Sequence, residues 1–196
     1  FYNSKGLEDI KEHKLIYEKS VKMMKSPLIK AFDISEESDV LKKAYGDNSF
    51  GKGCLMARRL IETGVKFVEV TLDGWDTHQD NFTRTQNLCK KLDPAFSTLV
   101  QDLSQKGMLE RTLVLCLGEF GRTPDINPNE GRDHFPNAFA CAIAGGGFKK
   151  GSVYGETSED GRQVISNPVS PENLFATLCS QLGIDFNKVN YSPQGR

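Results

Sequence analysis

Three short apolar segments, separated by glycine-rich and polar stretches, restrict the folds that are open to this 196-residue chain. Thr112–Leu117 is almost continuously apolar, as expected for a strand that is covered on both faces. Val65–Leu72 and Phe139–Ala144 have a similar length and character. A helical spacing of apolar residues over Gln79–Lys106 separates the first two segments. The order of strand, helix, strand and further strand predicts an α/β layered fold.

Other helices are indicated by apolar residues three and four apart and by proline or glycine near their ends: Leu7–Lys25, Glu36–Tyr45, Phe50–Thr63 and Ser170–Leu182. Two short strands are predicted over Ser152–Thr157 and Gln163–Ile165. Pro94 lacks an N–H group, so it is expected to kink or split the helix over Gln79–Lys106. We interpret residues 1–196 as a single partial α/β domain, with a helical segment over 1–49 and a core over 50–196.

Composition excludes some classes of function. The formal net charge of -1 gives no electrostatic footprint for nucleic acid, and no apolar stretch approaches the roughly 20 residues of a membrane span. The chain opens with Phe1 and a charged segment follows, so no signal peptide is recognised and a piece of a longer protein is expected. The five cysteines form no CxxC pair and are interpreted as buried thiols, which argues against an oxidising compartment.

Two of the three histidines lie in the polar stretches beside the apolar segments. Asp76 and His78 are two residues apart, so in an extended loop both side chains would point the same way and could bind one ion. Asp133 and His134 are adjacent and would face different directions, toward two neighbouring ions. The spacing alone leaves two alternatives open: a capped turn at Asp76, with His78 packed on the adjacent tryptophan, and a surface pair at Asp133 and His134.

Glu119 follows the most hydrophobic segment, where a carboxylate needs a partner. A metal ion and Arg122, three residues later, are equally good candidates for that partner. Arg122 and Arg132 flank the acidic residues, and their guanidinium groups suit phosphate or sulfate oxygens, although they could equally neutralise Glu119 and Asp133. A set of carboxylates and imidazoles suits zinc, manganese or iron. Paired ions of this kind can activate a nucleophile and bind the oxygens of a phosphoryl group.

The ordered motifs GWDTH, TLVLCLGEFGRTP, GRDHFP, AGGG and LFATLCSQLGID resemble a large bacterial family of unknown function, family fifteen-oh-one. The segment SFGKGCLMARRLIETGVKFVEV extends the likeness toward the amino terminus, so it takes in nearly the whole chain. That family is placed in the alkaline phosphatase and sulfatase superfamily. The resemblance implies a mostly parallel sheet between helix layers, alkaline-phosphatase/sulfatase-like, with two metal ions above the strand ends.

The resemblance also implies metal-ligand roles for five side chains: Asp76, His78, Glu119, Asp133 and His134. Asp76 and His78 resemble the superfamily's first Asp-and-His pair, although the usual spacing is wider. Glu119 sits where superfamily members often have an Asp-His pair, but Phe120 follows it, so one imidazole is missing there. His134 resembles the late histidine ligand, with Asp133 beside it.

The implied function is a metal-dependent hydrolase of phosphate or sulfate esters, with this chain carrying the second half of the metal site. Its ligand would be a small anionic ester or a sulfated or phosphorylated glycan. The superfamily's nucleophile is a Thr, Ser or modified Cys near the amino terminus, and nothing before Phe50 resembles it, so hydrolysis by this chain alone is not expected. The alternative is a non-catalytic sulfatase-like protein that binds an anionic glycan or a partner surface.

Two further expectations concern location and assembly. Members of the family usually carry export signals, so the resemblance implies a periplasmic or exported protein. A half domain would expose a raw sheet edge, and unpaired edges promote pairing with other chains. The sequence therefore predicts self-association as a homo-oligomer.

Overall fold

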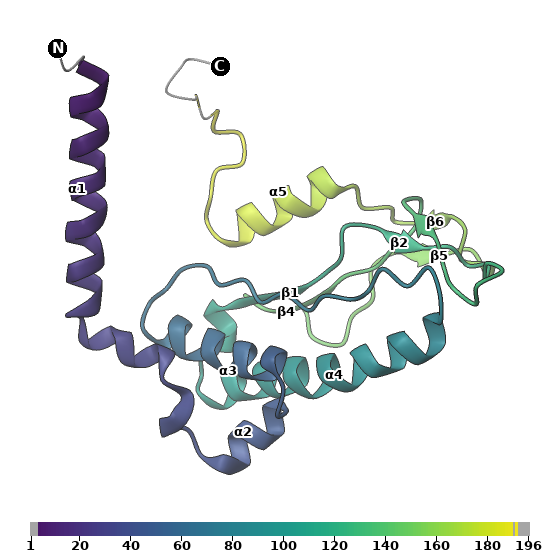
Figure 1. Ribbon diagram of the computed structural model, residues 1–196. Helices are drawn as coiled ribbons and strands as arrows, with labels where there is room; N and C mark the ends of the chain where they lie inside the picture. The colour runs from purple at the N-terminus through teal and green to yellow at the C-terminus, as the bar shows by residue number, and fades with distance from the viewer. Residues whose placement is uncertain (1–3, 190, 192–196) are drawn as a thin grey trace. The chain divides into compact units, whose positions relative to one another are not determined.

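The computed structural model describes residues 4–189 and 191, which form helices and short strands joined by long loops (Figure 1). The helices are α1 (Ser4–Met24), α2 (Asp39–Tyr45), α3 (Ser49–Glu62), α4 (Asn81–Gln105) and α5 (Pro171–Gln181), with 3-10 turns η1 (Pro27–Phe32), η2 (Ile34–Glu36) and η3 (Leu109–Arg111). The strands are β1 (Leu113–Cys116), β2 (Gly121–Arg122), β3 (His134–Phe135), β4 (Ala142–Gly145), β5 (Glu156–Thr157) and β6 (Val164–Ser166).

The chain divides into two compact units, which we describe separately. The first unit contains the residues up to Thr71 together with Pro94–Phe96 from the middle of α4. The second unit contains the remaining residues and therefore all of the strands. None of the helices in the described part of the chain is both long and apolar enough to cross a membrane.

Side chains that accept hydrogen bonds from free backbone N–H groups fix where several helices begin. Ser38 accepts from the N–H of Leu41 at the start of α2, and Asn48 accepts from the N–H of Gly51 at the start of α3. Ser170 caps α5, whose first residue is a proline, as the sequence predicts. Pro94 does not split α4, which runs without interruption over twenty-five residues.

The first unit buries charged side chains together with apolar ones. Tyr45 and Leu55 are 1% exposed, and Arg58, in the same helix as Leu55, is 2% exposed. The guanidinium of Arg58 lies 2.8 Å from Glu37 Oε1, and that of the adjacent Arg59 lies 2.5 Å from the same oxygen. We call Glu37, Arg58 and Arg59 the arginine cluster. It attaches the segment that follows η2 to α3.

The prediction of a mostly parallel sheet between helix layers is wrong. The described residues form three separate two-stranded sheets, β1–β4, β2–β3 and β5–β6, and each is antiparallel. In the first sheet Leu113 pairs with Gly145 and Cys116 with Ala142. A parallel pair needs a crossover connection, usually a helix. The connection between β1 and β4 contains no helix and instead forms the β2–β3 pair within loops, so the chain returns in the opposite direction.

Val65–Leu72, predicted as a strand, belongs to no strand of the described residues. Its side chains nevertheless alternate, because Val68 and Val70 are half-buried whereas Phe67 and Glu69 are exposed. Period-two alternation indicates an extended, half-buried backbone, and a strand needs a hydrogen-bonded neighbour as well. The sequence pattern therefore predicts the burial of this segment and not its pairing.

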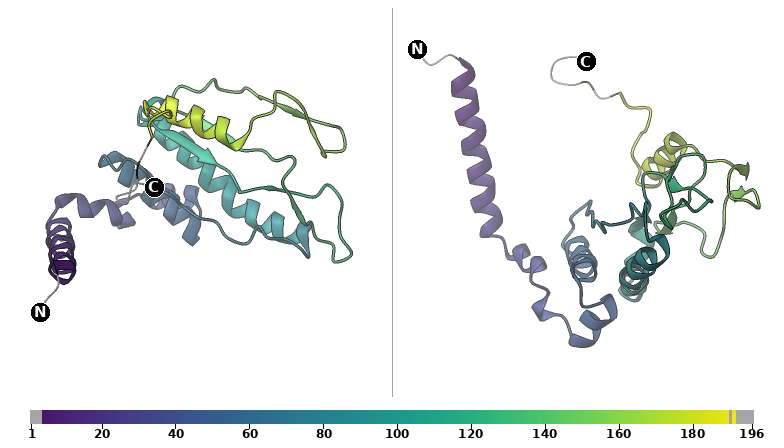
Figure 2. Two further views of the ribbon diagram at one scale, coloured as in Figure 1. Left: turned by 90° about the horizontal axis from the view of Figure 1, so that it is seen from above. Right: turned by 45° about the vertical axis from the view of Figure 1, so that its right-hand side comes forward.

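In the second unit α4 and α5 lie on opposite sides of the β1–β4 pair (Figures 1 and 2). The buried apolar residues described in the second unit are Leu88, Leu103, Met108, Leu109 and Leu178. The side-chain amide of Gln181, at the end of α5, donates a hydrogen bond to the carbonyl of Gly146 in the turn after β4. This packing leaves the loops before α4 and around β2 and β3 free to carry polar side chains.

Candidate metal centre

Two loops of the second unit lie side by side and form the candidate site. The first runs through residues 74–81 and the second through residues 122–134. Three main-chain hydrogen bonds join them: Arg132 N to Thr77 O at 2.9 Å, Asp80 N to Asn129 O at 3.2 Å and Asn81 N to Glu130 O at 2.9 Å. The second lies at an isolated antiparallel bridge between Gln79 and Glu130. Backbone bonds of this kind fix the separation of the loops independently of their side chains.

The close approach of the two loops requires glycine at position 131. A Cβ atom on Gly131 would lie 1.9 Å from the carbonyl oxygen of His78, so any larger residue would push the loops apart. Asp80 and Glu130 adopt left-handed backbone conformations, with φ of 52° and 57°. Such angles are uncommon for residues other than glycine and occur often at functional sites.

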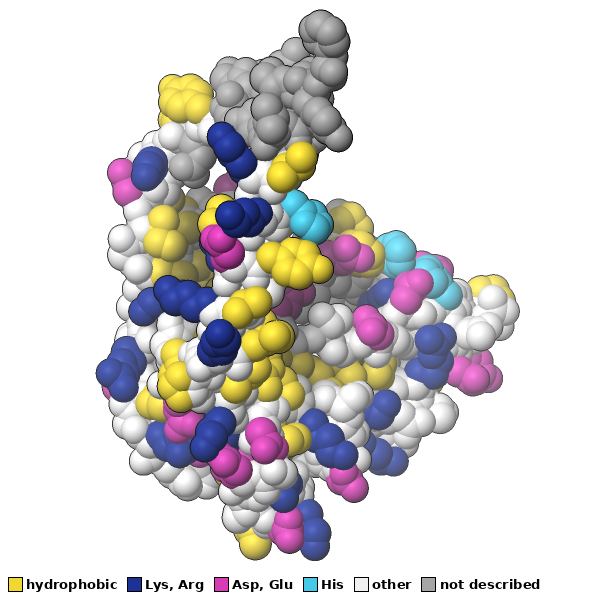
Figure 3. Space-filling model, turned by 60° about the vertical axis from the view of Figure 1, so that its left-hand side comes forward, with side chains coloured by type: hydrophobic (Ala, Val, Ile, Leu, Met, Phe, Trp, Pro, Cys, Tyr) yellow, Lys and Arg dark blue, Asp and Glu magenta, His cyan; other side chains and the backbone are white. Residues whose placement is uncertain are grey.

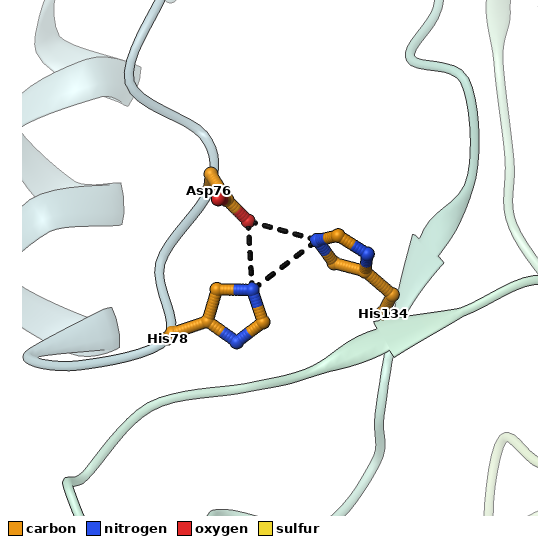
Figure 4. A group of neighbouring side chains, drawn as sticks. All are labelled: Asp76, His78 and His134. Atoms are coloured by element: carbon orange, nitrogen blue, oxygen red, sulfur yellow. Dashed lines mark hydrogen bonds and ion pairs between the residues drawn. The ribbon is translucent and has the colours of Figure 1, made fainter.

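The contact brings together one side-chain atom from each of Asp76, His78 and His134 (Figure 4). Asp76 Oδ1 lies 3.0 Å from His78 Nε2 and 3.0 Å from His134 Nε2. The two Nε2 atoms are 3.2 Å apart. We call these three residues the metal triad, because all three ligand atoms lie within 4.8 Å of one another. The expectation that Asp76 and His78 face the same point is confirmed.

Arg122 contacts the same oxygen of Asp76 that faces the two histidines. Its Nη2 donates to Asp76 Oδ1 at 2.7 Å. The hydrogen bond from His134 and then that from Arg122 lower the pKa of Asp76 to about 2. The Asp76 carboxylate is therefore ionised at neutral pH, as a metal ligand must be.

The β2–β3 pair and an aromatic ring set the position of His134. Arg122 pairs with His134 in the register of these strands, which places both side chains at the same end of the hairpin. The ring of Phe120 packs against the imidazole of His134 with 4.4 Å between ring centroids. The Arg122 guanidinium carbon lies 5.9 Å from the Phe120 centroid. Phe120, which replaces an expected imidazole, thus supports a neighbouring imidazole and a guanidinium.

Asp133 lies on the other side of His78. Its Oδ1 is 2.7 Å from His78 Nδ1 and accepts a hydrogen bond of 3.2 Å from Asn127 Nδ2. The bond with His78, followed by the bond with Asn127, holds the pKa of the Asp133 carboxyl below its usual range. Asp133 and His134 contact opposite ring nitrogens of His78, and the expectation that they face two neighbouring ions stays a prediction.

Glu119 and Arg132 lie outside the metal triad. Glu119 is exposed, and among the residues that the structure describes it joins no group of three close ligand atoms. Its role as a ligand therefore stays a prediction. Arg132 Nη1 donates to the carbonyls of Thr123 and Pro124 at 2.6 Å each, so its guanidinium holds the second loop together.

The metal triad is open to solvent. The side chains of Asp76, His78 and His134 are 66%, 45% and 51% exposed. Figure 3 shows histidine side chains beside acidic and basic ones on the molecular surface. Two imidazole nitrogens and one carboxylate oxygen form a mixed donor set that fits zinc, manganese or iron. Three ligands at an exposed position would leave room for further ligands.

Asn127 is a residue of the site that the sequence analysis missed. Its Oδ1 accepts from the N–H groups of Asn129 and Gly131 at 2.9 Å each, which folds the second loop into a tight turn. Its Nδ2 donates to the carbonyl of His78 at 3.0 Å and so joins the two loops. The signal was present in the sequence as Asn127-Pro128-Asn129, because asparagine before proline is typical of turns closed by a side chain.

The family described as "Protein of unknown function (DUF1501)" has a model that matches the chain over residues 1–196. No curated protein and no solved structure matches the chain.

Proposed function

This chain belongs to the DUF1501 family, and on that premise we propose that it serves the metal-dependent hydrolysis of phosphate or sulfate esters and carries the second half of the metal site. The metal triad is the main observation that supports the proposal. Asp76 and His134 are 58 residues apart in sequence, yet their side chains converge on one exposed point together with His78. The ordered motifs support a place in the alkaline phosphatase and sulfatase superfamily, and with it an exported protein.

In this proposal Asp76 Oδ1 and the Nε2 atoms of the two histidines hold one divalent ion. A divalent ion held there would supply Lewis-acid chemistry toward an ester and toward water. The triad's exposure supports access by a substrate carried on a larger molecule, such as a sulfated or phosphorylated glycan.

Arg122 is the side chain best placed to bind the anionic ester. It already contacts the metal triad through Asp76, and guanidinium groups bind phosphate and sulfate oxygens through paired hydrogen bonds. The Nη1 of Arg132 donates to two carbonyls of its own loop, whereas Arg122 reaches the ligand oxygen of Asp76 through Nη2 and donates to the carbonyl of Arg132 through Nη1. We therefore assign substrate binding to Arg122 and loop structure to Arg132.

Water is the nucleophile that the contacts favour. The hydroxyl of Thr77 is buried and donates to Asn81 Oδ1 at 2.7 Å. The hydroxyl of Thr123 donates to the carbonyl of Asp125 at 2.9 Å and accepts from the N–H of Asp133. Both loop hydroxyls are committed to protein partners, which also supports the alternative function of a metal-dependent binding protein that does not hydrolyse its ligand.

The first experiment measures the metal content of the purified chain by mass spectrometry after incubation with zinc, manganese or iron(II) and removal of free ions. We expect about one ion per chain, in keeping with a single three-ligand site. The His78→Ala/His134→Ala double variant should lose the ion. His13→Ala is the matched control, because His13 lies on α1 in the first unit and stacks on Tyr17. Equal metal in all three proteins would reject the site.

The second experiment measures turnover of an aryl phosphate and an aryl sulfate by the metal-loaded chain. Hydrolysis that is lost in His78→Ala and retained in His13→Ala would support the enzyme. A metal-loaded chain that binds phosphate or sulfate without turnover would support the binding protein instead. An Arg122→Ala variant should bind either anion more weakly than the native chain in both cases.

A further inference from the structure

Helix α1 carries an exposed apolar stripe, which we define as Ile10, Tyr17, Val21 and Met24. Each of these side chains is at least 40% exposed. They occupy the a and d positions of a heptad, the seven-residue repeat of coiled coils, and Lys14 occupies the a position between the first two. Covering such a stripe removes apolar surface from water, which favours association with a partner.

The width of the apolar stripe indicates that the partner is another helix. A helix that lies on the core of a domain presents an apolar face at least about 100° wide, whereas a coiled-coil seam is narrower. At 100° per residue the four positions of the stripe span roughly 60° of the helix circumference. The length of α1, twenty-one residues, corresponds to three heptads.

We infer that α1 is a dimerisation helix that pairs, in antiparallel orientation, with α1 of a second copy of this chain. The inference goes beyond the proposed function and does not depend on the metal triad. Two identical helices that pair around a two-fold axis use the same surface on both copies, so each contact occurs twice. That surface must therefore complement itself in shape and charge.

Lys14 favours the antiparallel orientation. In a parallel dimer each residue of the seam faces its own counterpart, so two ammonium groups would meet at this position. In an antiparallel dimer a positions lie beside d positions, which places Lys14 beside the second copy's Tyr17 and Val21 beside the second copy's Ile10. An aromatic face attracts an ammonium group, and the lysine stem packs on apolar surface.

The charges beside the apolar stripe complement each other in the same register. Lys11 and Glu18 both occupy e positions and flank the stripe on one side. Antiparallel pairing brings Lys11 of one copy near Glu18 of the other, and the two-fold axis creates the same pair again. Within the helix Glu18 lies 3.9 Å from Lys14, so its carboxylate already faces the seam.

A groove along the end of α1 supports the same register. Its lining consists of Tyr17, Glu18, Val21, Lys22, Lys25 and Ser26. In the antiparallel dimer Ile10 of the second copy lies beside Val21 and inserts its side chain into this groove, as a knob enters a hole in a coiled coil. The groove and the apolar stripe therefore belong to one contact surface.

The test is the mass of the full chain in solution, measured by sedimentation equilibrium over a range of concentrations with a reducing agent. We expect a dimer of twice 21.8 kDa at high concentration. Tyr17→Glu/Val21→Glu should stay monomeric, because it places unpaired carboxylates in the seam. Ile16→Glu/Met23→Glu is the matched control and should dimerise as the native chain does, since both side chains are exposed and lie outside the stripe.

Charge reversal tests the orientation with exposed residues only. Lys11→Glu should raise the dissociation constant of the dimer about fivefold, because two attractive pairs become repulsive. Lys11→Glu/Glu18→Lys should restore the native value. An unchanged dimer in Lys11→Glu would overturn the inference. This pair of variants decides the outcome if circular dichroism shows that Tyr17→Glu/Val21→Glu does not fold.

Three other results would overturn the inference. The first is a native chain that is monomeric at every concentration, including one that binds phosphatidylglycerol vesicles instead. The second is a dimer that persists in Tyr17→Glu/Val21→Glu, which would place the interface on another surface. The third is an equal loss of the dimer in the matched control. Metal content should be the same in all variants, so failure of the dimer and failure of the proposed function are distinguishable.

Discussion

The arginine cluster of the first unit and the metal triad of the second unit are built from similar hydrogen-bonded charges, but their exposure to solvent differs. Arg58 and Glu37 have side chains that are 2% and 15% exposed, whereas Asp76 is 66% exposed. A buried pair cannot lose one partner cheaply, because an uncompensated charge stays behind. An exposed pair contributes at most about 1 kcal/mol. Loss of one partner is therefore expected to cost far more stability in the first cluster than in the second.

The largest expected effect is that of Arg58→Ala in the arginine cluster. Removal of this buried guanidinium should lower the free energy of unfolding by about 3–5 kcal/mol. Urea unfolding followed by circular dichroism measures the loss. Lys52→Ala is the control, since the Lys52–Asp47 pair is exposed and should contribute less than about 1 kcal/mol.

The two clusters would not differ in their contribution to stability if His78→Ala/His134→Ala destabilised the metal-free chain as much as Arg58→Ala does. We expect the double histidine variant to change the free energy of unfolding by less than about 1 kcal/mol while it removes metal binding. A large loss of stability would instead mean that the triad is a structural element of the second unit.

An effect smaller than that of Arg58→Ala is expected for Gly131→Ala. The added methyl group would meet the carbonyl of His78, and relief of such overpacking usually costs about 1–3 kcal/mol. It should also weaken metal binding, because the two loops carry different ligands. Trp75, the one tryptophan of the chain, lies in the first loop, so its fluorescence reports on this region during unfolding.

Gly118→Ala is the matched control for that experiment. A Cβ atom at position 118 would meet Phe120 O at 3.8 Å, which is an ordinary contact. If Gly131→Ala and Gly118→Ala bind metal equally well, the close approach of the loops is not what assembles the triad.

The smallest effect is a pH dependence that originates in Glu37. Burial raises the pKa of this carboxyl, but the hydrogen bonds from Arg59 and then Arg58 outweigh burial and leave the pKa below its usual value. A carboxyl with a lowered pKa stabilises the fold above its unfolded pKa of about 4.3, and the contribution is lost as the pH falls through the lower folded value. The difference in urea midpoint between the native chain and Glu37→Gln should therefore be largest near neutral pH and shrink in acid. A difference that grows in acid would contradict this assignment.

The sequence predicted the helices well, because apolar spacing and capping residues act locally. Ser170 with Pro171 marks the start of α5, and the apolar stripe over Gln79–Lys106 marks α4. The sheet was predicted wrongly. Apolar runs such as Thr112–Leu117 show that a strand is buried, but their pairing direction depends on the path of the connecting chain, which no local pattern encodes.

Prediction of the site shows the same difference between features that depend on neighbouring residues and features that depend on residues far apart in sequence. The spacing of Asp76 and His78 predicted that in an extended loop both side chains reach one point, with a capped turn as the alternative. The convergence of His134 on that point depends on contacts such as that between Thr77 and Arg132, which are made by backbone atoms. Backbone partners leave little trace in residue types, and the sequence could therefore not separate the role of Asp133 from that of His134.

The separation of the triad along the chain gives it one more property. Its histidines are 56 residues apart, and the loops that carry them meet mainly through backbone bonds. A bound ion would therefore join two loops that are far apart in sequence, and it would stabilise the folded chain because only folding brings its ligands together. Thermal stability would then depend on the concentration of free metal. Each tenfold rise in that concentration above the dissociation constant raises the free energy of unfolding by about 1.4 kcal/mol. The same chain would be more stable at high metal concentration and less stable at low metal concentration.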